Sequence, residues 1–319
     1  MMPVPCRLLI GRAPRYITRG LCITRCTHST TLSIQYNSIQ CPNQRASYRS
    51  SQFAPPYRRT VSTMASDQST TLDQLLVPSL LPRIYTFWFQ HIPSNKRLLL
   101  PSQEDWMKWF LKSDDFDSAC TSQFSTILTA IRDTNTTAED LLSRANPSTP
   151  QDWLALIILL DQLPRNIYRG ESSRIVFEFF DPLARTIALK AADAGFPSGT
   201  SPFRYRQGQR IWFYMPFIHA EDLDMQELAR IKYAEMAEDF TRLLDGDATG
   251  LSDDEAQCRQ ILLENRARLE EQLTTHFRVQ REHYEPIARF GRFPHRNVAL
   301  GRETSDEERR FLEEGKIFG

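Results

Sequence analysis

Residues 153–163 constrain the fold more than any other segment because they are apolar on almost every side. Thr149 and Pro150 stand just before them, and a capping threonine followed by proline at the first helical position is a typical helix start. A helix that is hydrophobic all round must be covered by other elements in every direction. We therefore expect this segment to form the central buried helix of the protein.

The rest of the body also has helical spacing, because apolar residues recur every three or four positions in residues 115–133 and 224–244. Pro182 predicts a kink or break in a further helix over residues 173–194. Pro286 and Gly291 are expected to end the longest helix, which a Ser-x-x-Glu capping pattern opens. The expected helices cover about residues 83–89, 103–110 after a Ser102 cap, 115–133, 150–163, 173–194, 224–244, 253–284 and 306–314 after a Thr304 or Ser305 cap.

No segment shows the strict alternation of a half-buried strand, so the predicted fold class is all-α. Candidate linkers at about 134–148, 195–210 and 245–252 are too short to force a second domain. We expect one antiparallel helical domain over residues 67–319. No repeat of fixed period is present, so the pattern alone does not separate a bundle from a TPR-like superhelix.

Charge divides the chain into two parts. The 39 basic and 39 acidic residues balance overall, yet residues 1–66 contain nine arginines, no lysine and no acid. The leader therefore carries +9 and the remainder −9. An Arg-rich, Ser-rich and acid-free leader is typical of a mitochondrial transit peptide and is expected to be disordered. The alternative is translation from Met64 and a cytoplasmic protein.

Composition also excludes several classes. Only Cys120 and Cys258 lie outside the leader, so no disulfide framework is expected. No apolar run is long enough to cross a bilayer, so a membrane partner is not expected. The acidic body argues against a nucleic-acid binder that relies on broad phosphate contact. No activated Ser or Cys nucleophile and no phosphate-binding Gly loop is evident, so we expect neither a covalent mechanism, an NTPase nor a cofactor.

The first polar cluster directly follows the apolar segment and contains Asp161, Arg165, Asn166 and Arg169. If the turn is helical, the two arginines share a face and could clamp a carboxylate or phosphate. The alternative, which this segment by itself favours, is an internal ion pair with Asp161 that holds the helix end.

The second cluster contains His219, Glu221, Asp222 and Gln226. A carboxylate beside a histidine can orient the imidazole for acid–base chemistry. The acids could instead cap a helix N-terminus, where negative charge is favourable. A metal site is the weakest interpretation, since the spacing matches no strong ligand pattern.

Two further clusters lie toward the C-terminus. His276 and His283 are seven residues apart and share one flank of the long helix, where histidines are commonly satisfied at the core edge. The other cluster is cationic and needs an anion, either internal or a ligand. Its main members are Arg292, His295, Arg296 and Asn297. The aromatic residues between 87 and 153 could line an apolar pocket but are better explained as core.

Together these clusters make the chain resemble the domain of unknown function 924 family over about residues 83–315. The residues that carry the resemblance are Phe87-Trp88-Phe89, Trp106, Trp109-Phe110, residues 159–170, Asp181-Pro182-Leu183-Ala184, Pro216, residues 219–222, Gln226, His283, residues 290–297 and residues 300–302. The resemblance implies a TPR-like all-helical fold and no established activity. It also implies that the polar clusters converge, because the family signature falls on all four.

We therefore expect a polar pocket for a small phosphate- or carboxylate-bearing ligand. Arg165, Arg169, Arg292 and Arg296 would hold the anion, and His219 with Glu221, and His283, would move protons. The other expected ligand-binding residues are Asp161, Asn166, Asp222, Gln226, His295 and Asn297. The competing hypothesis is a scaffold for a protein partner, in which these clusters form a structural ionic network.

Overall fold

The computed structural model describes residues 72–201 and 203–315, so the expected leader lies outside the described residues. No strand occurs in the part of the chain that is described, which confirms the all-α fold class. The TPR-like arrangement stays a prediction. The longer helices are α2 (Leu80–Phe89), α4 (Gln103–Phe110), α5 (Asp114–Asp133), α6 (Ala138–Ala145), α7 (Pro150–Ile167), α9 (Asp181–Asp193), α12 (Leu223–Asp245), α13 (Asp253–Glu264), α14 (Arg266–Phe290) and α15 (Asp306–Glu313). The short ones are α3 (Asn95–Leu99), η1 (Gly170–Ser172), α8 (Ser173–Ile175), η2 (Val176–Phe180), η3 (Phe203–Tyr205), α10 (Gln207–Arg210), η4 (Ile211–Phe213), α11 (Met215–Ile218) and η5 (Pro294–Arg296).

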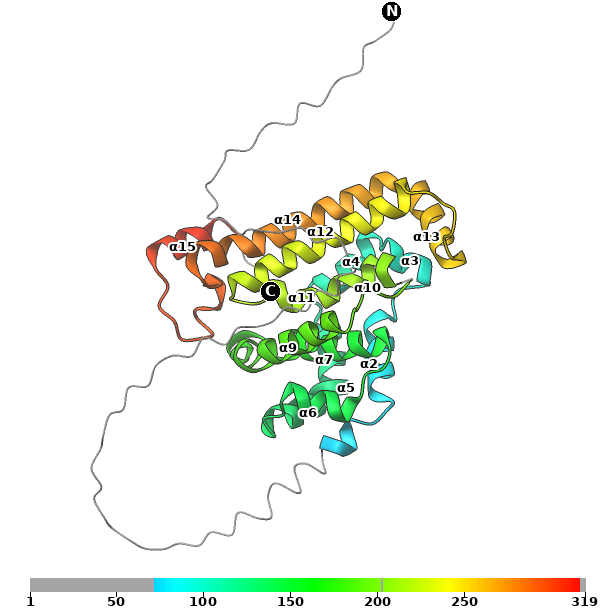
Figure 1. Ribbon diagram of the computed structural model, residues 1–319. Coiled ribbons are helices and arrows are strands. Elements are labelled where there is room, and N and C mark those ends of the chain that lie inside the picture. The colour runs from blue at the N-terminus through cyan, green and yellow to red at the C-terminus, as the bar shows by residue number, and fades with distance from the viewer. Residues whose placement is uncertain (1–71, 202, 316–319) are drawn as a thin grey trace, which may run out of the picture. The chain divides into compact units, whose positions relative to one another are not determined.

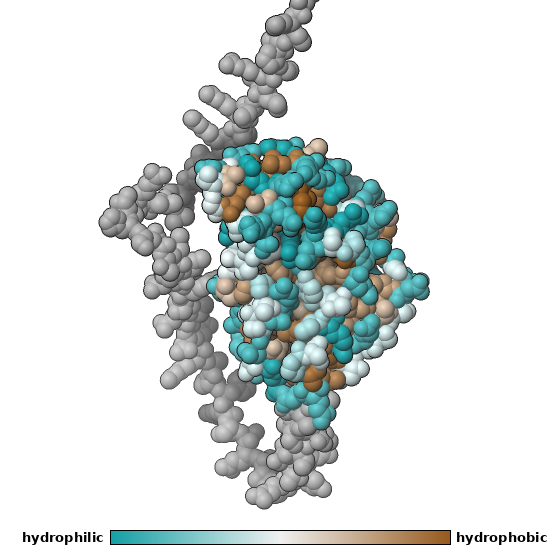
Figure 2. All heavy atoms as spheres, turned by 90° about the vertical axis from the view of Figure 1, so that its right-hand side faces the viewer, coloured by the Kyte–Doolittle hydropathy of each residue, from teal (hydrophilic) through white to brown (hydrophobic). Residues whose placement is uncertain are grey.

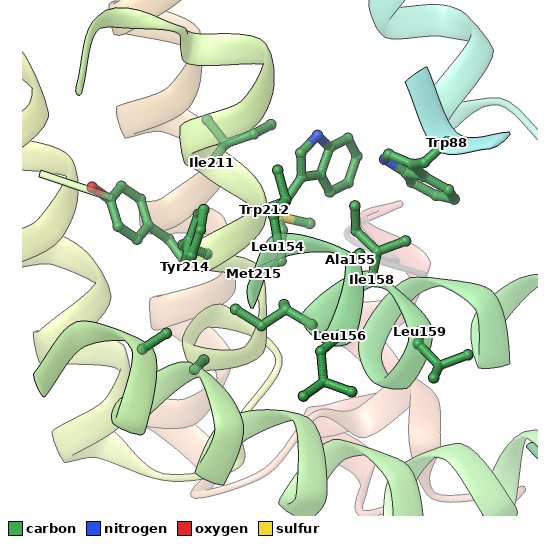
Figure 3. Close-up of a cluster of buried hydrophobic side chains, with 14 of the residues drawn as sticks. Trp88, Leu154, Ala155, Leu156, Ile158, Leu159, Ile211, Trp212, Tyr214 and Met215 are labelled. Atoms are coloured by element: carbon green, nitrogen blue, oxygen red, sulfur yellow. The ribbon is translucent and has the colours of Figure 1, made fainter. Parts of the chain in front are cut away.

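Helix α7 is the central buried helix, as predicted. It packs against α2, α5 and α9, and all four lie together in Figure 1. Every residue from Leu154 to Pro164 is buried. Buried leucines such as Leu154 and Leu159 run along α7, and its Ile158 lies beside Trp88 of α2 and Trp212 of η4 in the core (Figure 3). Truncating one such leucine to alanine typically costs about 2–5 kcal/mol, so this layer stabilises the fold substantially.

Several helix starts follow directly from local sequence. Ser102, Thr149, Ser252 and Ser305 each accept a hydrogen bond from the backbone N–H three residues later, and the acid at that position bonds back. Such a reciprocal cap satisfies two backbone donors that a helix would otherwise leave unpaired. The predicted caps are therefore confirmed, with Ser305 rather than Thr304 capping α15.

Other boundaries differ from the prediction. Helix α7 continues through Pro164 to Ile167, and α14 continues through Pro286 to Phe290, where Gly291 ends it with φ of 68°. Both prolines lie in buried turns, where packing offsets the lost backbone hydrogen bond. Helix α2 begins at Leu80 instead of 83, and α6 occupies the expected linker at 134–148.

The predicted long helix over 253–284 is wrong, because α13 and α14 are separate. Asn265 lies between them with non-helical dihedrals, and its side-chain amide donates to the carbonyl oxygen of Ile261 at 2.8 Å. An asparagine amide that bonds to nearby backbone competes with the helix, which accounts for the break.

Where a kink or break was predicted at Pro182, the chain stays helical but contains an irregular π-helical turn just before the proline. A π-helical turn, η2, separates α8 from α9, and Asp181 is the first residue of α9. π-helical turns are rare and often occur at functional sites. Here the turn places Phe177 and Asp181 beside the end of α7.

The C-terminal half returns to this central layer. Helices α12 and α14 run side by side in Figure 1, and the chain after α14 turns back through η5 before it ends in α15. On the face shown in Figure 2, hydrophilic side chains predominate, with hydrophobic residues showing between them. Among the described helices, none is long and apolar enough to cross a membrane.

Candidate functional site

A cavity of about 870 Å³ opens where the end of α7, the turn through η1, α8 and η2, and the loops after α11 and α14 meet. Its wall is rich in arginine, histidine and aromatic side chains. It is lined by Arg165, Tyr168, Arg169, Gly170, Glu171, Ser173, Arg174, Val176, Phe177, His219, His283, Phe293, His295, Arg296, Val298, Ala299 and Gly301. Predicted residues from all four sequence clusters therefore meet at one opening.

Asp181 links two of the wall arginines from behind. Its Oδ1 accepts a 2.5 Å hydrogen bond from Nη2 of Arg165 on α7, and its Oδ2 lies 3.3 Å from Nη1 of Arg296 in η5. The carboxylate itself is buried and is not part of the wall. Both arginines line the cavity, while the carboxylate that compensates their charge lies inside the protein.

Asp161 is the buried carboxylate that supports His219. Its Oδ1 accepts a 2.9 Å hydrogen bond from Nδ1 of His219, and its Oδ2 accepts one of 2.5 Å from Gln162. Nη2 of Arg165 lies 3.5 Å from the same Oδ1. Because a carboxylate oxygen accepts, Nδ1 carries the imidazole proton and Nε2 keeps its lone pair on the other edge of the ring.

Charge and burial set the protonation states of this pair. Burial raises the pKa of Asp161, but His219, Arg165 and hydrogen bonds from His219 and Gln162 more than offset it and lower that pKa to about 2. Burial lowers the pKa of His219, and Arg165 adds to the shift, against the opposing effect of Asp161. An ionised Asp161 and a neutral His219 are therefore the forms expected at neutral pH.

Two more imidazoles on the wall are neutral for similar reasons. Burial lowers the pKa of His283 to about 3, and its Nδ1 donates to the carbonyl oxygen of Val279 at 2.8 Å. Burial together with Arg296 and Arg165 lowers the pKa of His295 to about 3. His276, by contrast, lies away from the cavity.

Arg296 is held between two aromatic rings. Its guanidinium carbon lies 4.4 Å from the ring centre of Phe177 and 4.6 Å from that of Phe293. Nη2 donates to the carbonyl oxygen of His219 at 2.9 Å. Burial lowers the pKa of this guanidinium to about 10, because the nearby Asp181 does not fully compensate for lost water. The two rings therefore hold the guanidinium of Arg296 in place, and nearby carboxylates only partly balance its positive charge.

The wall retains unused hydrogen-bonding capacity. Nε of Arg165, Nε of Arg296 and the hydroxyl of Tyr168 are buried without a hydrogen-bond partner among the described residues. Most buried polar atoms in folded proteins are paired, so such a group of unpaired donors needs an explanation. A bound acceptor would satisfy them.

Two further arginines add positive charge to the part of the wall that is more exposed to solvent. Arg169 forms a bidentate pair with Asp117 of α5, and Arg174 pairs with Glu178. Both acids lie outside the wall, whose one acidic member among the described residues is Glu171. Arg165 and Arg169 thus share the cavity as predicted, although α7 ends between them.

Other predicted site residues support the wall from outside it. Glu221 accepts hydrogen bonds from the backbone N–H of Phe293 and from Arg302, so Asp161 rather than Glu221 is the carboxylate bonded to His219. Asp222 caps α12 by accepting from the backbone N–H of Asp224 and Met225.

The remaining four predicted residues form hydrogen bonds that hold neighbouring segments of the chain in place. Gln226 donates to the carbonyl oxygens of Ile218 and Ala220, and Arg292 forms a bidentate pair with Glu308. Asn297 donates to Thr304, and Asn166 donates to the carbonyl oxygen of Gln162. None of them is on the cavity wall.

Sequence reasoning did not identify most of the other lining residues, among them Tyr168, Arg174, Phe177 and Phe293, nor the supporting carboxylate of Asp181. A signal existed for Asp181, because an acid inside an apolar helix needs a cationic partner when it is buried. The aromatic residues gave no such signal, since their spacing is also that of core residues. Among the described residues, no group of three or more His, Cys, Asp or Glu is placed to hold a metal ion.

Residues 84–316 match the family model described as "Bacterial protein of unknown function (DUF924)". A solved structure of a protein of unknown function from Agrobacterium tumefaciens is similar at 29% identity, with 74% of this chain and 98% of that chain covered and a TM-score of 0.48. Comparison with curated proteins gives no match. The family model spans most of the chain, and the protein therefore belongs to the DUF924 family.

Proposed function

We propose that the cavity binds a small anionic ligand. The observation that carries this proposal is the buried, unpartnered Nε–H of Arg296 and of Arg165 in a wall with four arginines and one acid. The countercharges Asp161 and Asp181 lie behind the arginines, so a ligand meets guanidinium groups first. Guanidinium groups bind carboxylate and phosphate oxygens through charge-assisted hydrogen bonds.

The experiment is a thermal-shift titration of the full chain with inorganic phosphate and with acetate, against chloride at equal ionic strength. A ligand at a hundred times its Kd adds about 2.7 kcal/mol of stability. For a domain of this size that corresponds to a rise in melting temperature of roughly 5–10 °C. Arg296→Met should abolish the rise.

Arg292→Met is the matched control, because Arg292 lies in the same turn but pairs with Glu308 outside the cavity. It should keep the anion response. Wild-type protein without any anion-specific stabilisation, or equal loss in both variants, would support the scaffold hypothesis instead, in which the arginines serve only as an ionic network.

A second candidate function is acid–base catalysis on the bound anion. The hydrogen bond of 2.9 Å between Asp161 and Nδ1 of His219 supports it, because a carboxylate in this place orients the ring and stabilises an imidazolium. His219 would be the base, and His283, whose ring centre is 6.2 Å away, a second proton carrier. Turnover of an anionic metabolite that survives His219→Phe would contradict this role.

A further inference from the structure

We propose that the ligand is a 2-hydroxycarboxylate, a carboxylate whose neighbouring carbon carries a hydroxyl group. The proposal rests on the proposed anion site and names the chemistry that its buried end selects. Three groups define that end, namely Arg165, Arg296 and His219, and together with the rest of the wall they set four requirements.

The first requirement is a singly charged anion. Arg165 pairs with Asp181 at 2.5 Å, whereas Arg296 reaches its nearest carboxylate oxygen only at 3.3 Å, so the charge of one guanidinium at the buried end is incompletely compensated. A buried uncompensated charge is costly, so one negative charge on the ligand matches this end and a second would be left unpaired. A carboxylate satisfies the guanidinium donors with a single charge.

The second requirement is a hydrogen-bond donor. Asp161 occupies Nδ1 of His219, so the ring edge that borders the cavity offers the Nε2 lone pair. Two acceptors facing each other repel, and a carboxylate alone would leave this lone pair unmatched. The ligand must therefore carry an O–H or N–H group beside its carboxylate.

The third requirement is that this donor be uncharged. Four arginines and a single acid, Glu171, form the charged part of the wall. They disfavour an ammonium group, because like charges in a poorly solvated site repel strongly. A hydroxyl donates equally well without that cost.

The fourth requirement concerns spacing. Arg165 and His219 both reach Oδ1 of Asp161, at 3.5 and 2.9 Å, and Arg296 bonds to the backbone carbonyl of His219. Because Asp161 and one backbone carbonyl join these three side chains, the proposal places the hydroxyl of the ligand on the carbon next to its carboxylate. The cavity of about 870 Å³ leaves room for an apolar or aromatic body beside Tyr168 and Phe177.

Three probes with one body test the proposal by calorimetry on the full chain at pH 7. 3-Phenyllactate carries the hydroxyl, 3-phenylpropionate carries hydrogen at that carbon, and phenylalanine carries ammonium. We expect 3-phenyllactate to bind about tenfold more tightly than 3-phenylpropionate, the value of one buried hydrogen bond. Phenylalanine should bind no more tightly than 3-phenylpropionate.

His219→Phe removes the lone pair and should make the two acids bind equally. His276→Phe, with its ring packed against Trp106 outside the cavity, should keep the tenfold preference. A circular-dichroism melt checks that each variant is folded. The comparison of the three probes on the wild-type protein does not depend on the variants.

Equal binding of the two acids by wild type, tighter binding of phenylalanine, or a hydroxyl preference that survives His219→Phe would overturn the proposal. Binding of phosphate or acetate with none of the three probes would overturn it and leave the anion site standing. No response to any anion would refute the anion site itself.

Discussion

Two buried arginines differ in how completely the protein satisfies them. Arg210 is 0% exposed, and its Nε donates to the hydroxyl of Tyr214 at 2.6 Å. Its other nitrogens reach the carbonyl oxygen of Arg204 at 2.6 Å, Oγ of Ser198 at 3.2 Å and a carboxylate oxygen of Asp239 at 2.7 Å. This cluster is closed, with an acceptor for each guanidinium nitrogen.

Arg296 is 5% exposed, yet its Nε lacks a partner among the described residues and its nearest carboxylate oxygen, on Asp181, is 3.3 Å away. Burial lowers the pKa of both guanidiniums, but Tyr214 and Asp239 more than offset it and raise that of Arg210. The pKa of Arg296 falls to about 10. A closed cluster stabilises the fold, whereas an open one is available to a ligand.

The largest expected effect separates the two clusters by stability. Arg210→Met leaves Asp239 and several buried acceptors unpaired, which should cost about 3–5 kcal/mol in the free energy of unfolding. Arg296→Met should cost roughly half as much, because Asp181 keeps its 2.5 Å bond to Arg165. Urea denaturation measures both values. Equal losses would contradict the distinction between closed and open clusters.

Low pH should lower the stability of the protein through His295, which lies near Arg296 in the open cluster. Burial and the nearby arginines hold the pKa of His295 at about 3, against about 6.5 in the unfolded chain. The unfolded chain therefore binds an extra proton between these values, so stability is present above pH 6.5 and declines as the pH falls toward 3. One such group contributes about 1.4 kcal/mol per pH unit in this window.

Urea denaturation between pH 7 and 4 checks this dependence. His295→Gln should flatten the curve by about one proton, because it removes one group whose pKa differs between the two states. Arg210→Met should lower stability at every pH without changing the slope from this histidine. An unchanged slope in His295→Gln would show that the cavity end does not hold this imidazole neutral.

The smallest expected effect concerns Asp222, which lies close in sequence to His219 but caps α12. Asp222→Ala should cost about 1 kcal/mol of stability, the usual value of an N-cap, without changing anion affinity. Asp224→Ala is the matched control, since its side chain is exposed one residue beyond the helix start. A loss of anion binding in Asp222→Ala would place this carboxylate in the site after all.

The expectations that succeeded were local. The caps at Ser102, Thr149 and Ser252 depend on side chains three residues apart, so the sequence is sufficient to predict them. The predicted helix ends at residue 163 and at Pro286 were wrong, because buried packing continues α7 through Pro164 and α14 through Pro286. Tertiary contacts contribute more there than one lost hydrogen bond.

The candidate site also has a part that the sequence predicted and a part that it did not. Sequence reasoning identified Arg165, His219, His283 and Arg296, because charged groups beside apolar helices are conspicuous, and all four line the cavity. It paired His219 with the nearby Glu221, since proximity along the chain was the available guide. The bonded carboxylate is Asp161, which lies far away in sequence.

The sequence by itself determined that this chain is helical, where several of its capped helices begin, and which segment lies at the centre. Helical period, cap residues and apolar composition act over a few residues, so they can be read without knowing the fold. Only the tertiary structure decided that Asp181 joins Arg165 to Arg296, which arginines keep a free donor, and that one cavity unites four distant segments. Those features depend on which helices pack together, and packing involves the whole chain at once.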